Sequence, residues 1–287
     1  MMNNSENWLS YHIFFEDDRD VFLQKAIVPL IEELKAKLGI QQFFYIRYNE
    51  EGPHIRLRIL STHKKQTTLG KIIDATCRSY FGTNDFELRE MAYHPETERY
   101  GGTTALPFAE AHFVLSSKVC LTVLTEQPED VLSRALLLHF CMIAVSNLST
   151  VEIHRLYDSY VQSWFPHSGL SEAGTNFREV AFKHYEPEYQ RMPQKALFGE
   201  VNKRIEANEE TGISWLDTWI RGNKNILSDL FRSVGYESRF HRILESLIHM
   251  TNNRLGVKNY DEAFLAYLLK RTIEDASTPE SEPAKKP

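Results

Sequence analysis

The segment Phe43-Phe-Tyr-Ile-Arg-Tyr-Asn-Glu-Glu-Gly-Pro-His-Ile-Arg-Leu-Arg-Ile-Leu60 is the most informative about the fold, because it holds two strand-like runs separated by a turn-rich connection. Aromatic and β-branched residues dominate residues 43–48, and apolar residues alternate with polar ones over residues 55–60, so both runs predict strands. The connection is polar and contains Gly52-Pro53, a composition typical of turns. Residues 43–60 therefore predict a β-hairpin.

The segments on either side of this hairpin predict a small antiparallel sheet. Residues 8–15 are aromatic and β-branched and predict a strand, and residues 22–38 place apolar side chains at helical spacing up to Gly39. A second helix over residues 66–81 and a fourth strand over residues 85–92 follow the hairpin. The succession β-α-β-β-α-β is that of the ferredoxin-like arrangement, a four-stranded antiparallel sheet with two helices on one face.

The sequence becomes helical after Tyr100-Gly101-Gly102. Residues 104–165 predict two or three long helices, residues 166–225 predict weaker helical pieces and surface loops, and residues 238–255 and 261–272 predict two closing helices. We therefore predict an α+β fold, with an α/β sheet subdomain over residues 1–102 and a larger helical subdomain packed on it over residues 103–275. The polar, Pro-rich residues 276–287 predict a disordered tail.

Composition excludes several classes of protein. The 287 residues include 33 Lys and Arg against 39 Asp and Glu, a net charge of −6, so direct binding of a long nucleic acid is not expected. Three widely separated cysteines, Cys77, Cys120 and Cys141, argue against a disulfide framework. The N-terminus lacks the features of a signal peptide, and no stretch of about 18 apolar residues occurs. The sequence predicts a cytoplasmic protein without membrane segments.

The hairpin carries the first candidate functional residues. Successive side chains of a strand alternate between its faces, so His54, Arg56 and Arg58 share one face while their apolar neighbours enter the core. The two arginine Cα atoms would lie about 6.6 Å apart, a spacing at which both guanidinium groups can hold one carboxylate or phosphate. Arg47 is expected on the same face across the hairpin. A solvated strand face, with arginines paired to nearby acids, is the alternative that the pattern leaves open.

Two further segments bear candidate residues. Residues 93–102 end in Gly101-Gly102, which permits close backbone approach or positive φ before a helix N-terminus that attracts anions; a simple turn is the alternative. In residues 246–256, His249 lies beside Asn253 at the border of an apolar helical stripe. At that border the histidine reaches either a cleft or a structural partner.

The spacing of the histidines disfavours a metal site. His241, Glu245 and His249 form an i, i+4, i+8 row whose ends are about 12 Å apart along the helix axis, too far for one ion to hold all three. No His-Glu-x-x-His pattern and no nucleotide-binding or serine-hydrolase motif occurs in the sequence. We therefore expect neither a metal nor a cofactor.

Four stretches together resemble the C-terminal glutamate-elimination domain of lantibiotic dehydratases, which also occurs as a separate chain in thiopeptide-type bacteriocin biosynthesis. They are residues 8–15, 43–59, 93–102 and 246–256, and their order and spacing span nearly the whole chain. In that family, a companion domain transfers glutamate from glutamyl-tRNA to Ser or Thr hydroxyls of a precursor peptide. The elimination domain then expels glutamate and leaves dehydroalanine or dehydrobutyrine.

The resemblance implies the same lyase activity for this chain and assigns residues to it. The family's catalytic arginines fall on Arg56, Arg58 and Arg99, and its catalytic histidine falls on His249. We expect the neighbouring residues to contact the substrate, namely Arg47, His54, Tyr100, Gly101, Gly102 and Asn253. The family's Asp-Ser in the helix after the glycines corresponds here to Ser116-Ser117, which leaves any role of that acid unsupported.

These residue types suit a β-elimination. Negative charge develops on the peptide enolate and on the departing carboxylate, and arginines can stabilise both charges. Guanidinium groups do not act as bases, whereas an imidazole exchanges protons readily near neutral pH. The arginines are therefore expected to be clamps, and His249 is expected to transfer a proton, as base at Cα or as acid at the leaving group.

Two other functions stay open. A thiopeptide pyridine synthase uses a similar fold to join two dehydroalanines in a formal cycloaddition and to expel the leader peptide. A non-catalytic subunit of a split dehydratase would instead bind a leader peptide, for example by strand addition to a sheet edge. The expected partners are a glutamylated precursor peptide and a separate glutamyl-tRNA-dependent glutamylating subunit, because the chain lacks the length for that large domain. A homodimer is left open.

Overall fold

The computed structural model describes residues 6–82, 85–126, 131–168, 170, 176–192, 195–235 and 237–277. The chain divides into two units. Unit 1 comprises Met1–Val131 and Asn225–Val257, and unit 2 comprises Leu132–Lys224 and Lys258–Pro287. Every residue that the sequence predicts as catalytic or substrate-binding belongs to unit 1.

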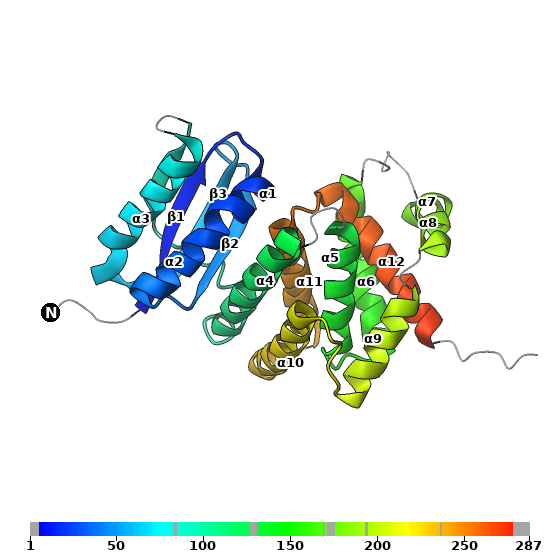
Figure 1. The fold of residues 1–287 in the computed structure, drawn as a ribbon. Helices are drawn as coiled ribbons and strands as arrows, with labels where there is room; N and C mark the ends of the chain where they lie inside the picture. The colour runs from blue at the N-terminus through cyan, green and yellow to red at the C-terminus, as the bar shows by residue number, and fades with distance from the viewer. Residues whose placement is uncertain are drawn as a thin grey trace, which may run out of the picture. The chain divides into compact units, whose positions relative to one another are not determined.

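A four-stranded antiparallel sheet is the framework of unit 1 (Figure 1). Its strands are β1 (Glu6–Phe14), β2 (Phe43–Tyr48), β3 (His54–Thr62) and β4 (Glu87–Met91), in the order β2-β3-β1-β4. Phe43 pairs with Ile59 and Tyr48 with His54, so the predicted hairpin is confirmed. The sheet and the many helices confirm the predicted α+β class.

Helices cover one face of this sheet. They are α1 (Arg19–Phe22), the π-helical turn η1 (Leu23–Ile27), α2 (Val28–Leu38) and α3 (His63–Phe81). The Asp18 carboxylate caps the first helix by accepting hydrogen bonds from the backbone N–H groups of Asp20 (2.7 Å) and Val21 (3.2 Å). The covered face and these helices form one hydrophobic core, whose members include Tyr11, Ile13, Phe22, Leu34, Tyr45, Leu57 and Ile73.

Two long helices lie beside β2 within unit 1. α4 (Leu106–Glu126) packs against β2 and against α11 (Glu237–Leu255). By length and composition α4 would be able to cross a membrane, but 61% of its apolar stretch is buried inside the protein. Burial of this kind is usual for a core helix, and Leu121 and Leu124 of α4 belong to the core of the sheet.

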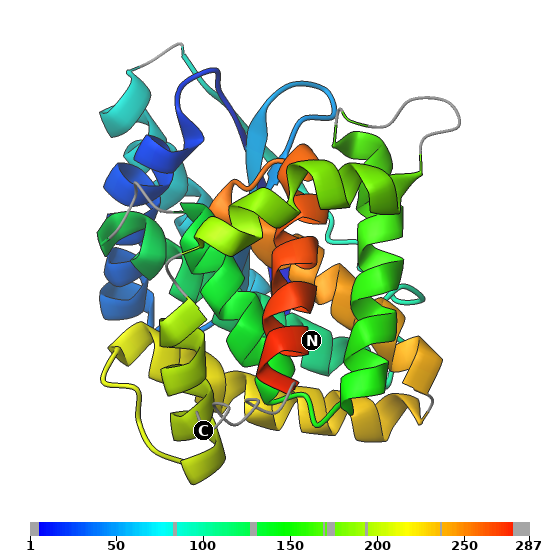
Figure 2. The same ribbon diagram turned by 90° about the vertical axis from the view of Figure 1, so that its right-hand side faces the viewer.

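Unit 2 is built from helices. They are α5 (Val131–Ala144), α6 (Thr150–Trp164), the 3-10 turn η3 (Phe165–His167), α7 (Phe177–His184), α8 (Glu186–Arg191), α9 (Lys195–Ala207), the first half of α10 (Ser214–Val234), and α12 (Asn259–Ser277). A capping box between Ser149 and Glu152 begins α6, which runs side by side with α12 (Figure 2).

The region before residue 225 is more regular than the sequence predicts. Weaker helical pieces are expected there, yet α10 continues without interruption from Ser214 to Val234. Asn223 is a poor helix former, but its buried side-chain amide donates to the carbonyl oxygen of Trp219 (3.0 Å). The Trp219 indole N–H donates in turn to the carbonyl oxygen of Leu138 (2.7 Å), so a tertiary contact stabilises this helix.

The predicted disordered tail begins too early. α12 extends to Ser277, so residues 276 and 277 end a helix. The rest of the predicted tail, residues 278–287, lies outside the described residues.

Candidate functional site

Strand β3 places two arginines on the sheet face opposite the helices α1–α3. Arg56 pairs with His12 of β1 and Ile46 of β2, and Arg58 pairs with Ser10 and Phe44 in the same way. The intervening Leu57 is fully buried in the core. The alternation predicted from the sequence is therefore present, and both guanidinium groups lie on one face.

Arg47 does not share this face, contrary to the prediction. It pairs with Ile55 in the hairpin register, and residues paired across a hairpin point to the same side of the sheet. Its guanidinium group forms an ion pair with Asp20 (2.5 Å) and donates through Nε (3.1 Å) and Nη2 (2.9 Å) to the carbonyl oxygen of Arg254. Arg47 thus connects β2 with the start of α1 and the end of α11.

His54 holds Arg56 in position through a side-chain hydrogen bond. Arg56 Nε donates to His54 Nε2 (3.0 Å), and His54 Nδ1 lies 2.8 Å from the carbonyl oxygen of Gly52. Because Nε2 accepts, the ring proton is on Nδ1, and burial further lowers the pKa of His54. The Arg56 guanidinium also stacks 3.5 Å from the centre of the Tyr48 ring, so its position is fixed from two sides.

Arg58 is a buried cation. Its exposed fraction is 8%, and its Cζ atom lies 5.3 Å from the ring centre of Phe44 and 5.0 Å from that of Tyr93. Burial lowers the pKa of Arg58 to about 10, so the group stays protonated at neutral pH. Among the residues that the structure describes, none accepts a hydrogen bond from its buried Nε. A charge in such a place is stabilised when a ligand supplies the missing acceptor.

The loop between β4 and α4 supplies a third arginine. Arg99 donates to Glu96 (2.9 Å) through Nη1 and to Ser246 Oγ of α11 (3.1 Å) through Nε. Gly101 lets the loop approach α11, because a Cβ atom there would lie 2.9 Å from Ile243. Tyr100 is buried with its ring against Phe113.

Helix α11 brings the histidine and the asparagine. His249 is half-buried, and Asn253 lies one helical turn further along the same face. The Asn253 side chain makes two hydrogen bonds to the backbone of Arg47: Oδ1 accepts from N–H and Nδ2 donates to the carbonyl oxygen, each at 2.9 Å. Asn253 therefore joins α11 to the edge of β2 in the manner of a neighbouring strand.

These elements surround one cavity of about 350 Å³. Its lining includes five arginines, Arg47, Arg56, Arg58, Arg99 and Arg254, two histidines, His94 and His249, and also Tyr100 and Asn253. All four predicted catalytic residues thus meet in one place. His54, Gly101 and Gly102 are outside the lining, with His54 behind Arg56 and the glycines in the backbone of the loop.

Arg254 is a charged lining residue that sequence reasoning missed. It is fully buried; its Nε donates to Ser117 Oγ (3.0 Å) and its Nη1 to the carbonyl oxygen of Met250 (2.9 Å). Burial lowers the pKa of its guanidinium. The signal was present in the sequence, because Arg254 follows Leu247 and Thr251 along the apolar stripe of α11. An arginine at a core position indicates a specific role.

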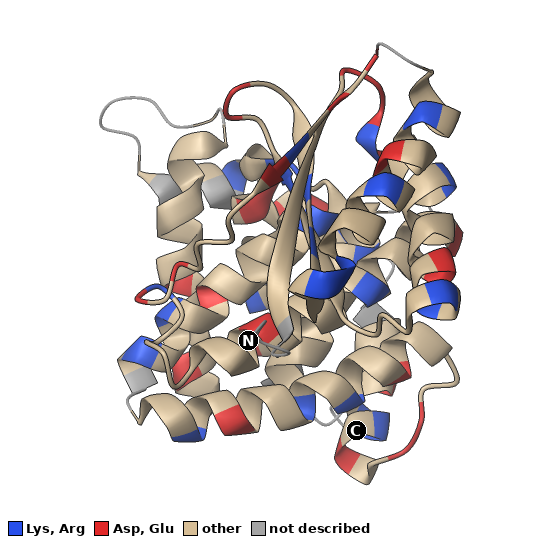
Figure 3. Cartoon of the chain, turned by 90° about the vertical axis from the view of Figure 1, so that its left-hand side faces the viewer, with Lys and Arg blue, Asp and Glu red and all other residues tan. Residues whose placement is uncertain are grey.

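The charge of the cavity is local. Lys and Arg are interspersed with Asp and Glu on the helices, and the sheet carries both basic and acidic segments (Figure 3). Within the cavity lining, five arginines stand against one acid, Glu96. The chain as a whole is acidic, so the positive potential belongs to this cavity and suits a small anionic group.

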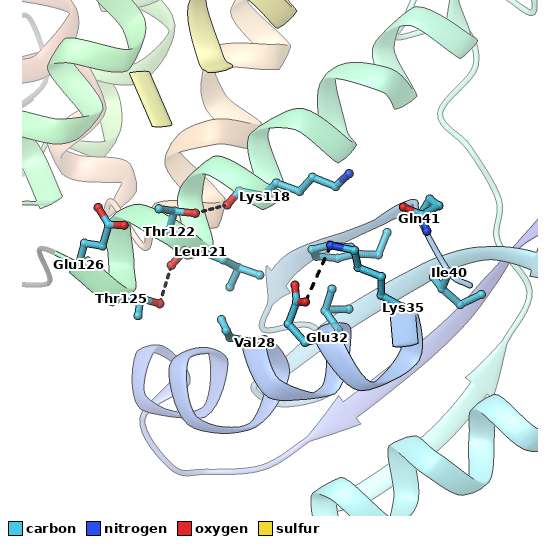
Figure 4. A pocket seen from close by; sticks show the side chains of 12 residues that line it. Val28, Glu32, Lys35, Ile40, Gln41, Lys118, Leu121, Thr122, Thr125 and Glu126 are labelled. Carbon is cyan, nitrogen blue, oxygen red and sulfur yellow. Dashed lines mark hydrogen bonds and ion pairs between the residues drawn. The ribbon is translucent and has the colours of Figure 1, made fainter. Parts of the chain in front are cut away.

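A second cavity of unit 1, about 400 Å³, lies between α2 and α4 (Figure 4). Its lining includes Lys35 and Lys118 together with Glu32 and Glu126, so its charges balance. Lys35 is 3.9 Å from Glu32. None of the residues that the sequence singles out belongs to this cavity, and we assign the candidate site to the arginine-lined one.

Comparison with known proteins gives a family match over nearly the whole chain. The model described as "Lantibiotic biosynthesis dehydratase C-term" matches residues 8–273. The chain is 25% identical over 273 residues to the epidermin biosynthesis protein EpiB of Staphylococcus epidermidis, and 25% identical over 283 residues to the nisin biosynthesis protein NisB of Lactococcus lactis subsp. lactis. Each match covers 92% of this chain and 25% of the relative, so the chain spans about a quarter of their length.

Solved structures share the fold. The tRNA-dependent lantibiotic dehydratase MibB from Microbispora sp. 107891 matches with a TM-score of 0.63 and 20% identity, over 94% of this chain and 28% of that one. The pyridine synthase TbtD from thiomuracin biosynthesis matches with a TM-score of 0.69 and 14% identity, over 94% and 98% of the two chains. TsrL matches with a TM-score of 0.71 and 15% identity, over 94% and 95%.

Proposed function

The chain belongs to the lantibiotic biosynthesis dehydratase C-terminal family, and from this premise we propose that it is a lyase that eliminates glutamate from glutamylated Ser or Thr residues of a ribosomally made precursor peptide. The product would be dehydroalanine or dehydrobutyrine. A glutamyl-tRNA-dependent glutamylating partner would supply the substrate, as the family resemblance implies.

One observation carries the proposal. Arg56, Arg58, Arg99 and His249 come from a strand, a loop and a helix, yet they line a single cavity. Four polar side chains of this kind seldom converge without a ligand that needs them. Two of them, Arg58 and Arg56, are held in place by aromatic rings and by His54, so the clamp exists before a substrate binds.

The reaction needs no cofactor or water. A base removes the Cα proton of the esterified residue, the electron pair forms the Cα–Cβ double bond, and the Cβ–O bond breaks to release a glutamate carboxylate. Negative charge therefore grows at the peptide carbonyl and on the leaving oxygen. The guanidinium groups can donate to both oxygens, and His249 is the proposed proton carrier.

The cavity has the size that this substrate requires. A volume of about 350 Å³ is at the small end of ordinary ligand sites, and a glutamyl group fills such a space together with one peptide residue. Phe44 and Phe113 contribute apolar rings to its lining. Apolar walls lower the local dielectric constant and so strengthen each charge interaction with the developing anion.

The alternative function, a non-catalytic subunit that binds a leader peptide by strand addition, is less favoured at the β2 edge of the sheet. Strand addition needs free backbone groups on β2, but the Tyr45 N–H donates to Ser117 Oγ (3.1 Å). Both backbone groups of Arg47 are bonded to Asn253. Side chains of α4 and α11 therefore occupy this edge of the sheet.

The test uses a precursor peptide that carries a glutamyl ester on one Ser, with loss of the glutamic acid mass followed over time. Arg99→Gln and His249→Gln are expected to slow the elimination at least about a hundredfold, a loss of about 3 kcal/mol of transition-state stabilisation. Matched controls are Arg78→Gln and His63→Gln, which alter exposed residues of α3 and should keep the wild-type rate.

Two outcomes would contradict the proposal. Rapid elimination by both site variants would remove the residue assignment. Turnover of a peptide that already contains dehydroalanines, with glutamyl esters left intact by the wild type, would favour the pyridine synthase reading instead.

A further inference from the structure

We propose that the second cavity of unit 1, between α2 and α4, binds a segment of the precursor peptide in which a carboxylate stands next to a bulky apolar side chain. The identity of this occupant rests on the proposed function, whereas the chemistry of the cavity does not. The second cavity and the arginine-lined cavity share no lining residue.

The floor of the second cavity is apolar. Val28 and Ile31 of α2 contribute to it, together with Ile40, Phe43 and Leu121. Val28 and Ile31 pack against the core of the sheet, yet each remains partly exposed. An apolar side chain that entered the cavity would cover these surfaces and remove them from water, which is favourable.

Two ammonium groups approach each other above this floor. Lys35 extends over it from α2 and Lys118 from α4 (Figure 4). Burial and, after it, the nearby charge of Lys35 lower the pKa of Lys118. The two cations repel each other, so an anion placed between them would be attracted by both.

The acids of the second cavity leave Lys118 without an ion pair. Glu32 lies 3.9 Å from Lys35, and both side chains are mostly exposed, so this contact is weak. Glu126 follows Lys118 by about 12 Å along the axis of α4, and its carboxylate points away from the two ammonium groups (Figure 4). In the described part of the chain, no carboxylate forms an ion pair with Lys118.

The hydroxyl groups of the α4 wall do not compete for an anion. Thr122 Oγ1 donates to the carbonyl oxygen of Lys118 (3.2 Å), and Thr125 Oγ1 donates to that of Leu121 (2.8 Å). Both protons are therefore used within the helix, as the dashed lines in Figure 4 show. The ammonium groups of Lys35 and Lys118 are the charged donors that remain for a ligand.

The occupant must satisfy the floor and the lysines together. A small inorganic anion would leave the apolar floor uncovered, and an uncharged apolar chain would leave the two ammonium groups unpaired. A volume of about 400 Å³ holds one bulky side chain with a short stretch of backbone. An acidic residue next to an apolar residue in one peptide meets both requirements.

The second cavity adjoins the arginine-lined cavity, which favours the precursor peptide as the source of this segment. Phe43 lines the second cavity, and Phe44, the next residue of β2, lines the arginine-lined one. On α4, Phe113 lines the arginine-lined cavity, and Lys118 follows about 7.5 Å further along the helix axis. About ten extended residues span about 33 Å, so one peptide can occupy both cavities. Binding at the second would raise the local concentration of the esterified residue at the first.

The first experiment measures binding without any reaction. The probe is a fluorescein-labelled decapeptide of Gly and Ser with a central Glu-Phe pair, and its binding to the full chain is followed by fluorescence polarisation. Exchange of the pair for Gln-Phe removes the charge, and exchange for Glu-Ser removes the apolar side chain. Each change is expected to weaken binding about tenfold. Equal affinities of the three peptides would overturn the inference.

A reversal of charge identifies the groups that bind the probe. Lys118→Glu should weaken binding of the Glu-Phe peptide at least about tenfold and should bind a Lys-Phe peptide more tightly than the wild type does. The matched control is Lys71→Glu, at an exposed position of α3, which makes the same change in net charge and should keep the wild-type affinities. Equal losses in Lys118→Glu and Lys71→Glu would show that the effect is general electrostatics and would refute the site.

The second experiment uses the glutamylated substrate, with a Glu-Phe pair placed about ten residues from the esterified Ser. The loss in Lys118→Glu should appear as a KM about tenfold higher rather than as a lower kcat, because the second cavity binds the peptide and does not touch the reacting atoms. An unchanged KM would contradict the inference.

The outcomes separate this inference from the proposed function. Binding that depends on the Glu-Phe pair and on Lys118, in a wild type that releases no glutamate, supports the peptide site and refutes the elimination. Normal elimination without any preference for the Glu-Phe pair refutes the peptide site alone. Binding of a separate glutamylating subunit that is lost in Lys118→Glu, while peptide binding persists, would assign the second cavity to that subunit and overturn the inference.

Discussion

The side-chain amide of Asn253 bonds both backbone groups of Arg47, 206 positions earlier in the chain, at 2.9 Å each. The sequence assigns Asn253 to substrate binding because it lies beside His249. The contacts instead favour a positioning role, in which α11 is fixed to β2 so that His249, one turn away, reaches the cavity.

Replacement of Asn253 by Asp should disturb this attachment. A carboxylate can accept from the Arg47 N–H but cannot donate to its carbonyl oxygen, which would then face a negative charge. We expect a decrease of about 2 kcal/mol in the free energy of unfolding, measured with denaturant. Asn253→Gln keeps both groups on a longer side chain and should restore part of the loss; equal stability of Asn253→Asp and wild type would contradict this role.

Gly101 and Gly102 share a backbone conformation but differ in their surroundings, so alanine substitutions at the two positions can be compared. Both have φ near +90°, at +91° for Gly101 and +89° for Gly102. A Cβ at Gly101 would lie 2.8 Å from Ala105 and from Val234, whereas at Gly102 the nearest atom is on Arg239, 3.6 Å away. Gly101→Ala should therefore destabilise the protein by about 3 kcal/mol, through clash and strain, and Gly102→Ala by about 1 kcal/mol through strain alone. Denaturant unfolding of both variants checks the difference, and equal losses would show that packing at Gly101 does not matter.

His54 should matter for activity through Arg56. His54→Phe keeps the ring between Phe14 and Tyr48 but removes the acceptor for Arg56 Nε. We expect elimination to slow about tenfold, as for the loss of one hydrogen bond to a charged group. His54→Gln retains an acceptor and should lose less. The rates of glutamate release by the two variants decide the point, and an unimpaired His54→Phe would exclude a supporting role.

Acidification should destabilise the sheet at His12. Its pKa is lowered from 6.5 to about 4, first by burial and then by the nearby charges of Arg56, Arg58, His54 and Arg89. Between these two values the unfolded chain binds a proton that the folded chain does not, so the free energy of unfolding falls as the pH decreases from about 6.5 through about 4.

The His12→Gln variant isolates this effect from the other acidic groups. The stability difference between wild type and variant, measured with denaturant at pH 7 and at pH 4.5, should shift against the wild type at the lower pH. A difference that does not change with pH would show that His12 titrates alike in the folded and unfolded chain.

Much of unit 1 follows from local pattern. The hairpin, the pairing of Arg56 and Arg58 on one face, and the succession of strands and helices are encoded in alternation, helical spacing and turn residues. The face of Arg47 was predicted wrongly, because the hairpin register that sets it depends on the exact length of the turn. Arg254 was overlooked because helical spacing alone marks its position as buried and says nothing of its partners.

Local sequence pattern is enough to predict which residue types are available for the chemistry and on which strand, loop or helix each one lies. That they share a cavity depends on tertiary contacts: Arg99 reaches Ser246 across 147 positions, and Asn253 reaches Arg47 across 206. Local pattern arises from the geometry of neighbouring residues, whereas these contacts arise from the packing of α4 and α11 against β2, which no periodicity in the sequence records.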